Sequence, residues 1–269
     1  MYLSKKDFLA AMEAIAPAHL AEEWDNVGML IDCGQEEYRK ILFALDLTES
    51  VARQAVRAGA DLVVTHHPVM LSGIKRLDGS TGESRAILAM IRHGISHFAA
   101  HTNFDCSNWS TNAYLASLLE LIDPRPLTEG GMGRIGELKQ PVTLAKLMEK
   151  VGRILNSNTV RAAGDPEKVI RKLAIVTGAG MSLVREAVAA GADALLTGDV
   201  KYHGAAEAVA GGIAIVDAGH FPTERPAVIQ LIQGLQAHCH ALQCKADIMT
   251  ELCLAEENDV FWSAGNIVE

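Results

Sequence analysis

The stretch "VARQAVRAGADLVVTHHPVM" (Val51–Met70) decides which fold the sequence predicts. It passes from an Ala-rich helical run to an apolar run with the length of a buried strand. Runs of the same two kinds surround it, with "KILFALDL" before it and "SRAILAMIRHG" and "ISHFAAH" after it. Strands that alternate with helices in this way are typical of βαβ units around a mainly parallel sheet, so the sequence predicts an α/β fold.

The first part of that stretch has a close counterpart later in the chain. Val51–Thr65 aligns with Leu183–Thr197 at an offset of 132, and eight of the fifteen positions are identical. Composition alone would give about one or two matches. We interpret the likeness as an internal duplication that gives two related lobes. The alternative is that two ordinary helix–strand units share a common "AGAD" turn.

A second pair of segments repeats as well. "HGISHFAAHTNFD" ends in His101 and, four residues later, Asp105, whereas "GGIAIVDAGHFPTE" ends in His220 and Glu224. Each pair follows an apolar, strand-like run. Because ligands of open α/β sheets bind beyond the carboxyl ends of the strands, we expect facing lobes to bring both pairs into one cleft, together with the adjacent histidines of the opening stretch.

Those adjacent histidines, His66 and His67, stand where a strand should end. On a regular strand, neighbouring side chains point to opposite faces. Pro68 lacks a backbone N–H and helps to end the pairing, so the pleat need not hold there and the two rings can serve neighbouring metal ions. Three or four histidines with two carboxylates suit zinc, iron or manganese and exceed what one tetrahedral zinc needs, so we expect two divalent ions. The candidates are His66, His67, His101, Asp105, His220 and Glu224.

Other histidines have simpler interpretations. His203 in "TGDVKYHGAAEA" starts a helical run just after a strand, which makes it a candidate to line a substrate pocket. The remaining five are expected to be surface residues or hydrogen-bonded core residues, namely His19, His93, His97, His238 and His240.

Composition narrows the class of protein. The 269-residue chain has a formal net charge of −9, which argues against general nucleic-acid binding. Its five cysteines are odd in number and show no CxxC spacing, as in a reduced cytoplasmic protein. No apolar run is long enough to span a membrane.

At the N-terminus, Ser4 and Asp7 resemble a capping box and Pro17 should stop the helix, so this segment does not look like a signal peptide.

Two glycine-rich stretches and one irregular segment complete the reading. "GMGRIG" lies in a loop and is rejected as a dinucleotide fingerprint, whereas "LAIVTGAGMSLVREA" combines a strand, a glycine turn and a helix. That turn either binds an anion through its N–H groups or uses glycine for steric reasons.

"DPRPLTEGGMGRIG" (Asp123–Gly136) is the least regular stretch and the best candidate for a boundary between lobes. It gives an N-terminal lobe over 1–126 and a C-terminal lobe over 127–269, with no inserted third domain.

The motifs taken together resemble the Nif-three-like proteins, often named GTP cyclohydrolase 1 type 2 homologs. The resemblance covers nearly the whole chain and rests on "AEEWDNVGMLI", "ALDLTESV", "GADLVVTHHPVM", "AHTNFD", "GMGRIGEL", "GADALLTGDVKYH" and "DAGHFPTE", of which THHP, HTNxD and GHxxxE in this order are highly specific. The tail "TELCLAEENDVFWSAGNIVE" and the "CSNWSTN" after HTNFD depart from the family pattern.

The resemblance implies two interlocked α/β/α lobes with a dinuclear metal site in the cleft between them. It places the metal ligands on His66, His67, Asp105, His220 and Glu224, with His101 beside the site, and it implies a homo-oligomer, a ring-like hexamer. The implied activity is metal-dependent hydrolysis of a small-molecule substrate, a purine nucleotide such as GTP by the family name, with His101 or His203 as proton donor. A metal-binding protein without turnover and a dinuclear phosphoesterase are the alternatives.

Overall fold

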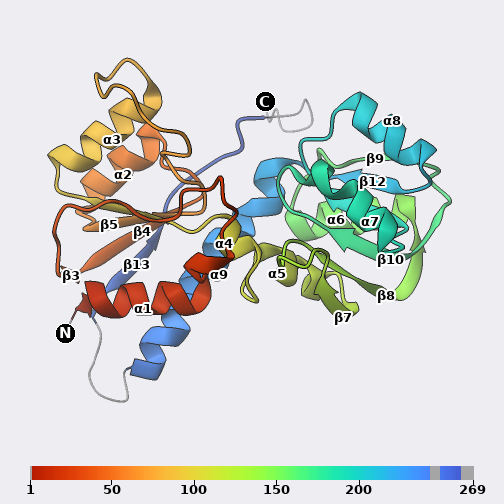
Figure 1. Cartoon of the computed structure of the whole chain (residues 1–269), viewed down its shortest axis with the longest axis horizontal. Helices are drawn as coiled ribbons and strands as arrows, with labels where there is room; N and C mark the ends of the chain where they lie inside the picture. The colour runs from red at the N-terminus through yellow and green to blue at the C-terminus, as the bar shows by residue number, and fades with distance from the viewer. Residues whose placement is uncertain (1, 243–248, 262–269) are drawn as a thin grey trace, which may run out of the picture. The chain divides into compact units, whose positions relative to one another are not determined.

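The computed structural model describes residues 2–242 and 249–261, and these form a mixed α/β fold, as the sequence predicts (Figure 1). The described residues divide into two compact units. The first comprises 2–109, 227–242 and 249–258, and the second comprises 110–226 and 259–261. The boundary expected near residue 126 stays a prediction. Within the described part of the chain, no helix is both long and apolar enough to cross a membrane.

The first unit is built around a five-stranded sheet with the order β13-β4-β5-β6-β2. Strands β13, β4, β5 and β6 run parallel, and β2 pairs antiparallel with β6 at one edge. Strands β1 and β3 form a separate antiparallel pair. The bounds are β1 (Leu3–Ser4), β2 (Gly28–Ile31), β3 (Glu37–Tyr38), β4 (Lys40–Ala44), β5 (Leu62–Thr65), β6 (Ser96–Ala99) and β13 (Glu251–Leu254).

Helices cover both faces of this sheet. Helices α2 and α3 pack against each other and, with Leu42 and Val63, form one core cluster (Figure 1). On the other face, Phe8 of α1 packs edge-on against Phe98 and Tyr38, with ring centroids 5.3 and 5.4 Å apart. The helices are α1 (Lys5–Ile15), η1 (Ala18–Leu20), α2 (Glu49–Ala58), α3 (Gly82–Arg92), α4 (Thr102–Asp105) and, from residue 227, α9 (His220–Leu242).

The first helix has the ends that the sequence predicts. The hydroxyl of Ser4 accepts the backbone N–H of Asp7 at 3.0 Å and donates to its carboxylate at 2.7 Å. Helix α1 ends at Ile15, two residues before Pro17. The cap satisfies one of the N–H groups that a helix start leaves without an intrahelical partner.

The second unit contains a six-stranded sheet with the order β7-β8-β10-β11-β12-β9. Strands β10, β11 and β12 run parallel, and the other three pair antiparallel with their neighbours. The bounds are β7 (Leu121–Pro126), β8 (Arg134–Thr143), β9 (Arg161–Ala163), β10 (Val169–Ile175), β11 (Ala194–Thr197) and β12 (Ala214–Asp217).

This second sheet is also covered on both faces. One core cluster joins α5 and α6 to Leu173, Leu196 and Val216, and the other joins α7 and α8 to Leu195 and Ile215. Neighbouring residues of one strand thus serve opposite cores, as the pleat requires. The helices are α5 (Thr111–Leu118), α6 (Leu144–Leu155), η2 (Gly180–Leu183), α7 (Val184–Ala189), α8 (Tyr202–Ala210) and the first residues of α9.

The aspartates of the two "AGAD" turns make the same contacts in their own units. Oδ2 of Asp61 and Oδ2 of Asp193 each accept two successive backbone N–H groups, at the beginning of β4 and within β10 respectively. The donors are Arg39 (2.6 Å) and Lys40 (3.1 Å) for Asp61, and Arg171 (2.8 Å) and Lys172 (2.9 Å) for Asp193. Each carboxylate therefore ties the start of its strand to the preceding parallel strand.

The irregular stretch Asp123–Gly136 adopts more regular structure than its composition suggests. Most of it belongs to β7, β8 and the turn between them, a hairpin inside the second unit. Its prolines are tolerated because β7 is the edge strand of the sheet, where one row of N–H groups needs no partner strand. The pairing of β7 with β8 shifts register between Ile122 and Arg125, around the first of these prolines.

Candidate metal centre

Three histidines of the first unit place ring nitrogens close together. His66 and His67 follow β5 directly, and His101 precedes α4. One ring nitrogen from each lies within 4.8 Å of the others, and the ring centroids are 5.1 to 5.5 Å apart. Strand pairing ends at Thr65, so the two adjacent rings are no longer held on opposite faces of the sheet.

The backbone selects the tautomer of neutral His66. Its Nδ1 donates to the carbonyl oxygen of Ala100 at 2.8 Å, and because a carbonyl oxygen can only accept, the neutral ring carries its proton on Nδ1. Nε2 then presents its lone pair and lies 3.7 Å from Oδ2 of Asp105, the last residue of α4. Both side chains are buried, at 0% and 10% exposure. This pair of donor atoms fits a shared cation.

Two carboxylates fix the other histidines in the same way. Nδ1 of His67 lies 2.9 Å from Oδ1 of Asp46, and Nδ1 of His101 lies 2.9 Å from Oδ1 of Asp25. An ionised carboxylate only accepts, so in the neutral ring it places the proton on Nδ1 and the lone pair on Nε2. Such carboxylate–histidine pairs are the usual support of a metal-ligating imidazole.

Asp25 is held in its ionised form. Burial alone would raise the pKa of this carboxyl group, but hydrogen bonds from the side chains of His101 and Thr102 outweigh it and hold the pKa well below its usual range. The backbone N–H of Thr102 also donates to Oδ2 at 3.0 Å. Asp25 therefore joins the loop before β2 to the first turn of α4, where His101 stands.

The second unit carries one histidine–carboxylate pair. His220 is the first residue of α9, and Glu224 follows one helical turn later, with Nε2 and Oε2 2.7 Å apart. Nδ1 of His220 lies 2.7 Å from Oδ2 of Asp199, so this ring is held as the others are. Asp199 adopts a left-handed backbone conformation, with φ at 55°, which Asp and Asn tolerate better than most residues with a side chain.

A glycine turn leaves space for this pair. Gly178, with φ at +64°, lies so close to Glu224 that a Cβ atom would collide with Oε1 and come within 3.3 Å of Nε2 of His220. The N–H groups of both glycines are already used, since Gly178 donates to the hydroxyl of Thr223 at 3.0 Å and Gly180 to that of Thr197 at 2.8 Å. The glycines of "VTGAGMS" therefore serve a steric role.

Three of the remaining histidines lie outside these groups. His203 is exposed on α8, with its ring edge-on to Tyr202 at 5.2 Å. His97 is a core residue whose Nε2 lies 2.8 Å from the hydroxyl of Thr65, and burial lowers its pKa to about 3. His93 is exposed and bonds to the carbonyl of Ala89 in its own helix. His97 and His93 therefore fit the simpler interpretations given to them.

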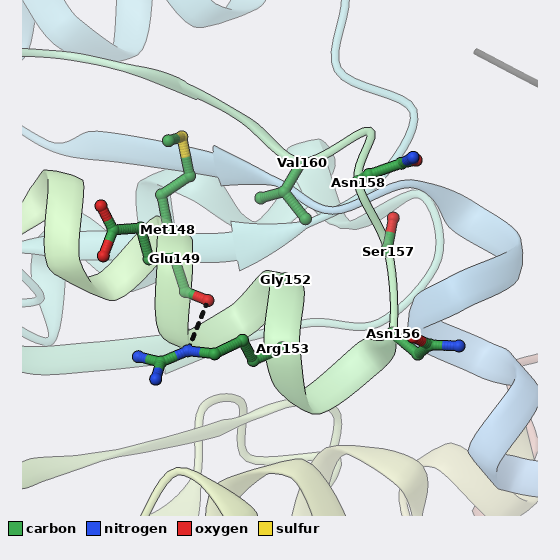
Figure 2. A pocket seen from close by; sticks show the side chains of 8 residues that line it. All are labelled: Met148, Glu149, Gly152, Arg153, Asn156, Ser157, Asn158 and Val160. Carbon is green, nitrogen blue, oxygen red and sulfur yellow. Dashed lines mark hydrogen bonds between the residues drawn. The ribbon is translucent and has the colours of Figure 1, made fainter. Parts of the chain in front are cut away.

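Of two pockets in the described structure, one is lined by a histidine of the cluster and the other by none of the proposed ligands. One of about 360 Å³ adjoins His67 and is also lined by the carboxylates of Asp46, Glu49 and Glu83, which disfavours an anionic occupant there. A second, of about 840 Å³, lies at the end of α6 in the second unit, where Nε of Arg153 donates to the carbonyl of Glu149 (Figure 2). Its lining is Met148, Glu149, Gly152, Arg153, Asn156, Ser157, Asn158 and Val160.

Sequence reasoning missed three supporting residues, although each lies in a quoted motif. Asp25 stands in "AEEWDNVGMLI", Asp46 in "ALDLTESV" and Asp199 in "TGDVKYH". Each is separated from its histidine by about twenty or more residues, so no local spacing pointed to it. For Asp46 and Asp199 the available signal was an acidic residue just after a strand, whereas Asp25 lies in the loop before β2 and had no such signal.

Comparison with known proteins gives a consistent picture. A sequence model of the family Duf34/NIF3 (NGG1p interacting factor 3) matches residues 3–252. A "GTP cyclohydrolase 1 type 2 homolog" from Clostridium perfringens is 35% identical over 236 residues, covering 86% of this chain and 90% of that protein. One of the same name from Streptomyces coelicolor is 38% identical over 231 residues, covering 82% and 81%.

Solved structures show the same fold. A Bacillus cereus protein related to NIF3 superposes with a TM-score of 0.89 at 22% identity and covers 98% of this chain and 100% of its own. Reduced HcgD from Methanocaldococcus jannaschii superposes with a TM-score of 0.78 at 27% identity, covering 94% and 98%. With a family match over nearly its whole length and relatives above 30% identity, the chain belongs to the DUF34/NIF3 family.

Proposed function

We propose that the chain binds two divalent metal ions and uses them to hydrolyse a small-molecule substrate. One observation carries the proposal. Three histidines of the first unit have Nδ1 committed to a carbonyl or carboxylate oxygen, and each therefore offers Nε2 as a ligand, while His220 of the second unit lies between the carboxylates of Asp199 and Glu224. The exposed His93 has a similar Nδ1 contact, so the distinguishing feature is that His66, His67 and His101 also place one ring nitrogen each within 4.8 Å of the others, as expected for metal-ligating histidines.

The proposed ligands come from both units. The set in the second unit consists of His220 and Glu224, which is fewer than the three or four protein ligands of typical zinc sites. We therefore propose that both sets serve the same two ions, with His101 as an accessory ligand or supporting residue. The ligands are His66, His67, Asp105, His220 and Glu224, and zinc, iron and manganese all suit them.

The residues have distinct proposed tasks. When bound, two ions of this kind would activate water for attack on the substrate. The carboxylates of Asp105 and Glu224 would bridge or chelate the ions. The proton for the leaving group would come from His101 or His203. His101 can exchange a proton only through Nε2, because Nδ1 is held by Asp25, whereas His203 is exposed and can take a proton from solvent.

Metal analysis tests the ligand proposal. The purified protein should contain about two ions per chain. His66→Ala, in the first unit, and Glu224→Ala, in the second, should each lower that content. His93→Ala is a matched control, because this histidine also bonds a carbonyl oxygen through Nδ1 but is exposed directly after the end of α3. Unchanged content in either ligand variant would remove that residue from the site.

The substrate class comes from the names of the relatives and is tested by product analysis. Metal-loaded protein is incubated with GTP and with a generic phosphodiester, and formate, phosphate and the alcohol released from the diester are measured. We expect formate, because hydrolytic opening of the purine's imidazole ring leaves a formamide, and a second hydrolysis releases formate from it. Phosphate or the alcohol without formate would indicate a dinuclear phosphoesterase, and the absence of all three products would leave a metal-binding protein without turnover. The proposed cytoplasmic location and homohexamer are tested by cell fractionation and light scattering.

A further inference from the structure

The C-terminal segment after β13 lies against the end of β4. β13 pairs with β4 in parallel, and Ala255, which is 2% exposed, continues the pairing by donating to the carbonyl of Phe43 at 2.8 Å. Glu256 is held from both sides by Gln54, whose amide donates to its carbonyl and accepts its N–H, both at 2.9 Å. This segment, Ala255–Glu257, therefore has a defined position on the first unit.

The next side chain, Glu257, caps the end of β4. Oε2 accepts the backbone N–H of Leu45 at 2.7 Å, and Oε1 accepts that of Asp46 at 3.1 Å. Both donors follow the last paired residue of the strand, and a backbone N–H at such a place needs another acceptor. Hydrogen bonds to an ionised carboxylate are among the stronger ones in proteins.

The same two residues hold His67. The carbonyl of Leu45 accepts the backbone N–H of His67 at 2.9 Å, and the carboxylate of Asp46 accepts its Nδ1 proton at 2.9 Å. Glu257 is therefore linked to His67 by two routes, one through the backbone and one through the side chain of Asp46.

We propose that Glu257 is a positioning residue for His67, which it orients through Leu45 and Asp46. The inference rests on the proposed metal site, for which it names a supporting residue from the far end of the chain. It assigns a role to the tail, which departs from the family pattern in sequence. Loss of a residue that supports a ligand commonly lowers metal affinity 10- to 100-fold, so we expect about tenfold for Glu257.

The test compares two neighbouring carboxylates. Glu257→Gln keeps the shape of the side chain but leaves one accepting oxygen for two N–H donors. Glu256→Gln makes the same charge change one residue earlier, where the hydrogen bonds to Gln54 run through the backbone. Two quantities are measured: zinc affinity by competition with a chelator, and the ring ¹⁵N chemical shifts of His67 in metal-free protein, which report the tautomer.

We expect Glu257→Gln to lower zinc affinity about tenfold and to reduce the Nδ1–H tautomer of His67, while Glu256→Gln changes neither. Glu257→Asp should recover part of both, and it replaces the glutamine variant if circular dichroism shows that protein to be unfolded. An unchanged tautomer, or equal effects in the two glutamine variants, would overturn the inference. A wild-type protein without zinc affinity would instead refute the proposed function, and the tautomer comparison would still decide the role of Glu257.

Discussion

The carboxylate of Asp25 has no exposed surface, yet it is ionised and accepts the Nδ1 proton of His101 at 2.9 Å. A buried carboxyl group normally gains a raised pKa, because burial penalises its charge. Here donors from His101 and Thr102 reverse that effect. The pair shows that the loop containing Asp25 belongs to the histidine cluster, although 76 residues separate the two.

Replacing Asp25 should destabilise the fold in a pH-dependent way. Asp25→Ala removes the acceptor for His101 and Thr102, and we expect a loss of about 2–3 kcal/mol at pH 7. The folded pKa is lower than the unfolded value, so this stability is present above about pH 4 and is lost as the pH falls toward the folded pKa. Urea denaturation of metal-free protein at pH 7 and pH 3 measures it. A difference that persists undiminished in acid would contradict the assignment.

His97 should make the protein less stable in mild acid. Its folded pKa of about 3 lies below the unfolded value, so between about pH 6.5 and pH 3 the unfolded state binds more protons. Stability from this residue is complete above about pH 6.5 and falls by up to about 1.4 kcal/mol per pH unit below it. His97→Leu should flatten that slope in urea denaturation of metal-free protein, whereas the exposed His93→Leu should not. Equal slopes in all three proteins would be inconsistent with a buried neutral His97.

Gly178 and Gly59 form a matched pair for testing the glycine turn. Both have φ at +64°, but a Cβ at Gly59 meets nothing within 4 Å, whereas one at Gly178 collides with Glu224. An alanine at either position should cost about 1–2 kcal/mol of backbone strain. Only Gly178→Ala should also lower metal content, because it displaces a proposed ligand. Thermal denaturation and metal analysis separate the two effects, and equal metal content in both variants would exclude the steric role.

Asp199 should support His220 without contributing much to stability. Asp199→Asn keeps a residue type that tolerates the left-handed conformation, so the free energy of unfolding should change little. The amide presents one accepting oxygen and no charge to Nδ1 of His220, and metal affinity should fall about tenfold. Chelator competition and thermal denaturation of metal-free protein measure the two. A large loss of stability with unchanged affinity would reverse this assignment.

The sequence predicted the elements whose signals are local. The run "ADLVVTH" became β5, the helix starting after Ser4 has its cap, and the two histidines lie beyond a strand end. These features depend on periodicity, capping and the loss of an N–H at Pro68, all of which can be read from neighbouring residues.

Contacts across long separations were not predictable in the same way. Asp46 meets His67 only because β4 and β5 are adjacent and parallel, and Glu257 reaches Leu45 only because β13 pairs with β4. Sequence patterns indicate that strands exist more readily than they indicate which strands are neighbours. The hairpin of β7 and β8 is not evident in the irregular stretch Asp123–Gly136, because Pro and Gly are typical of loops, although an edge strand accommodates prolines.

The acceptors on Nδ1 also bear on how an ion would enter. Each imidazole is oriented by an oxygen of the protein itself, from Ala100, Asp46, Asp25 or Asp199, so capture would require little loss of side-chain freedom. Shedding of hydration water, and not chain rearrangement, would then limit the speed of loading. Exchange of one divalent cation for another would proceed on an already rigid frame.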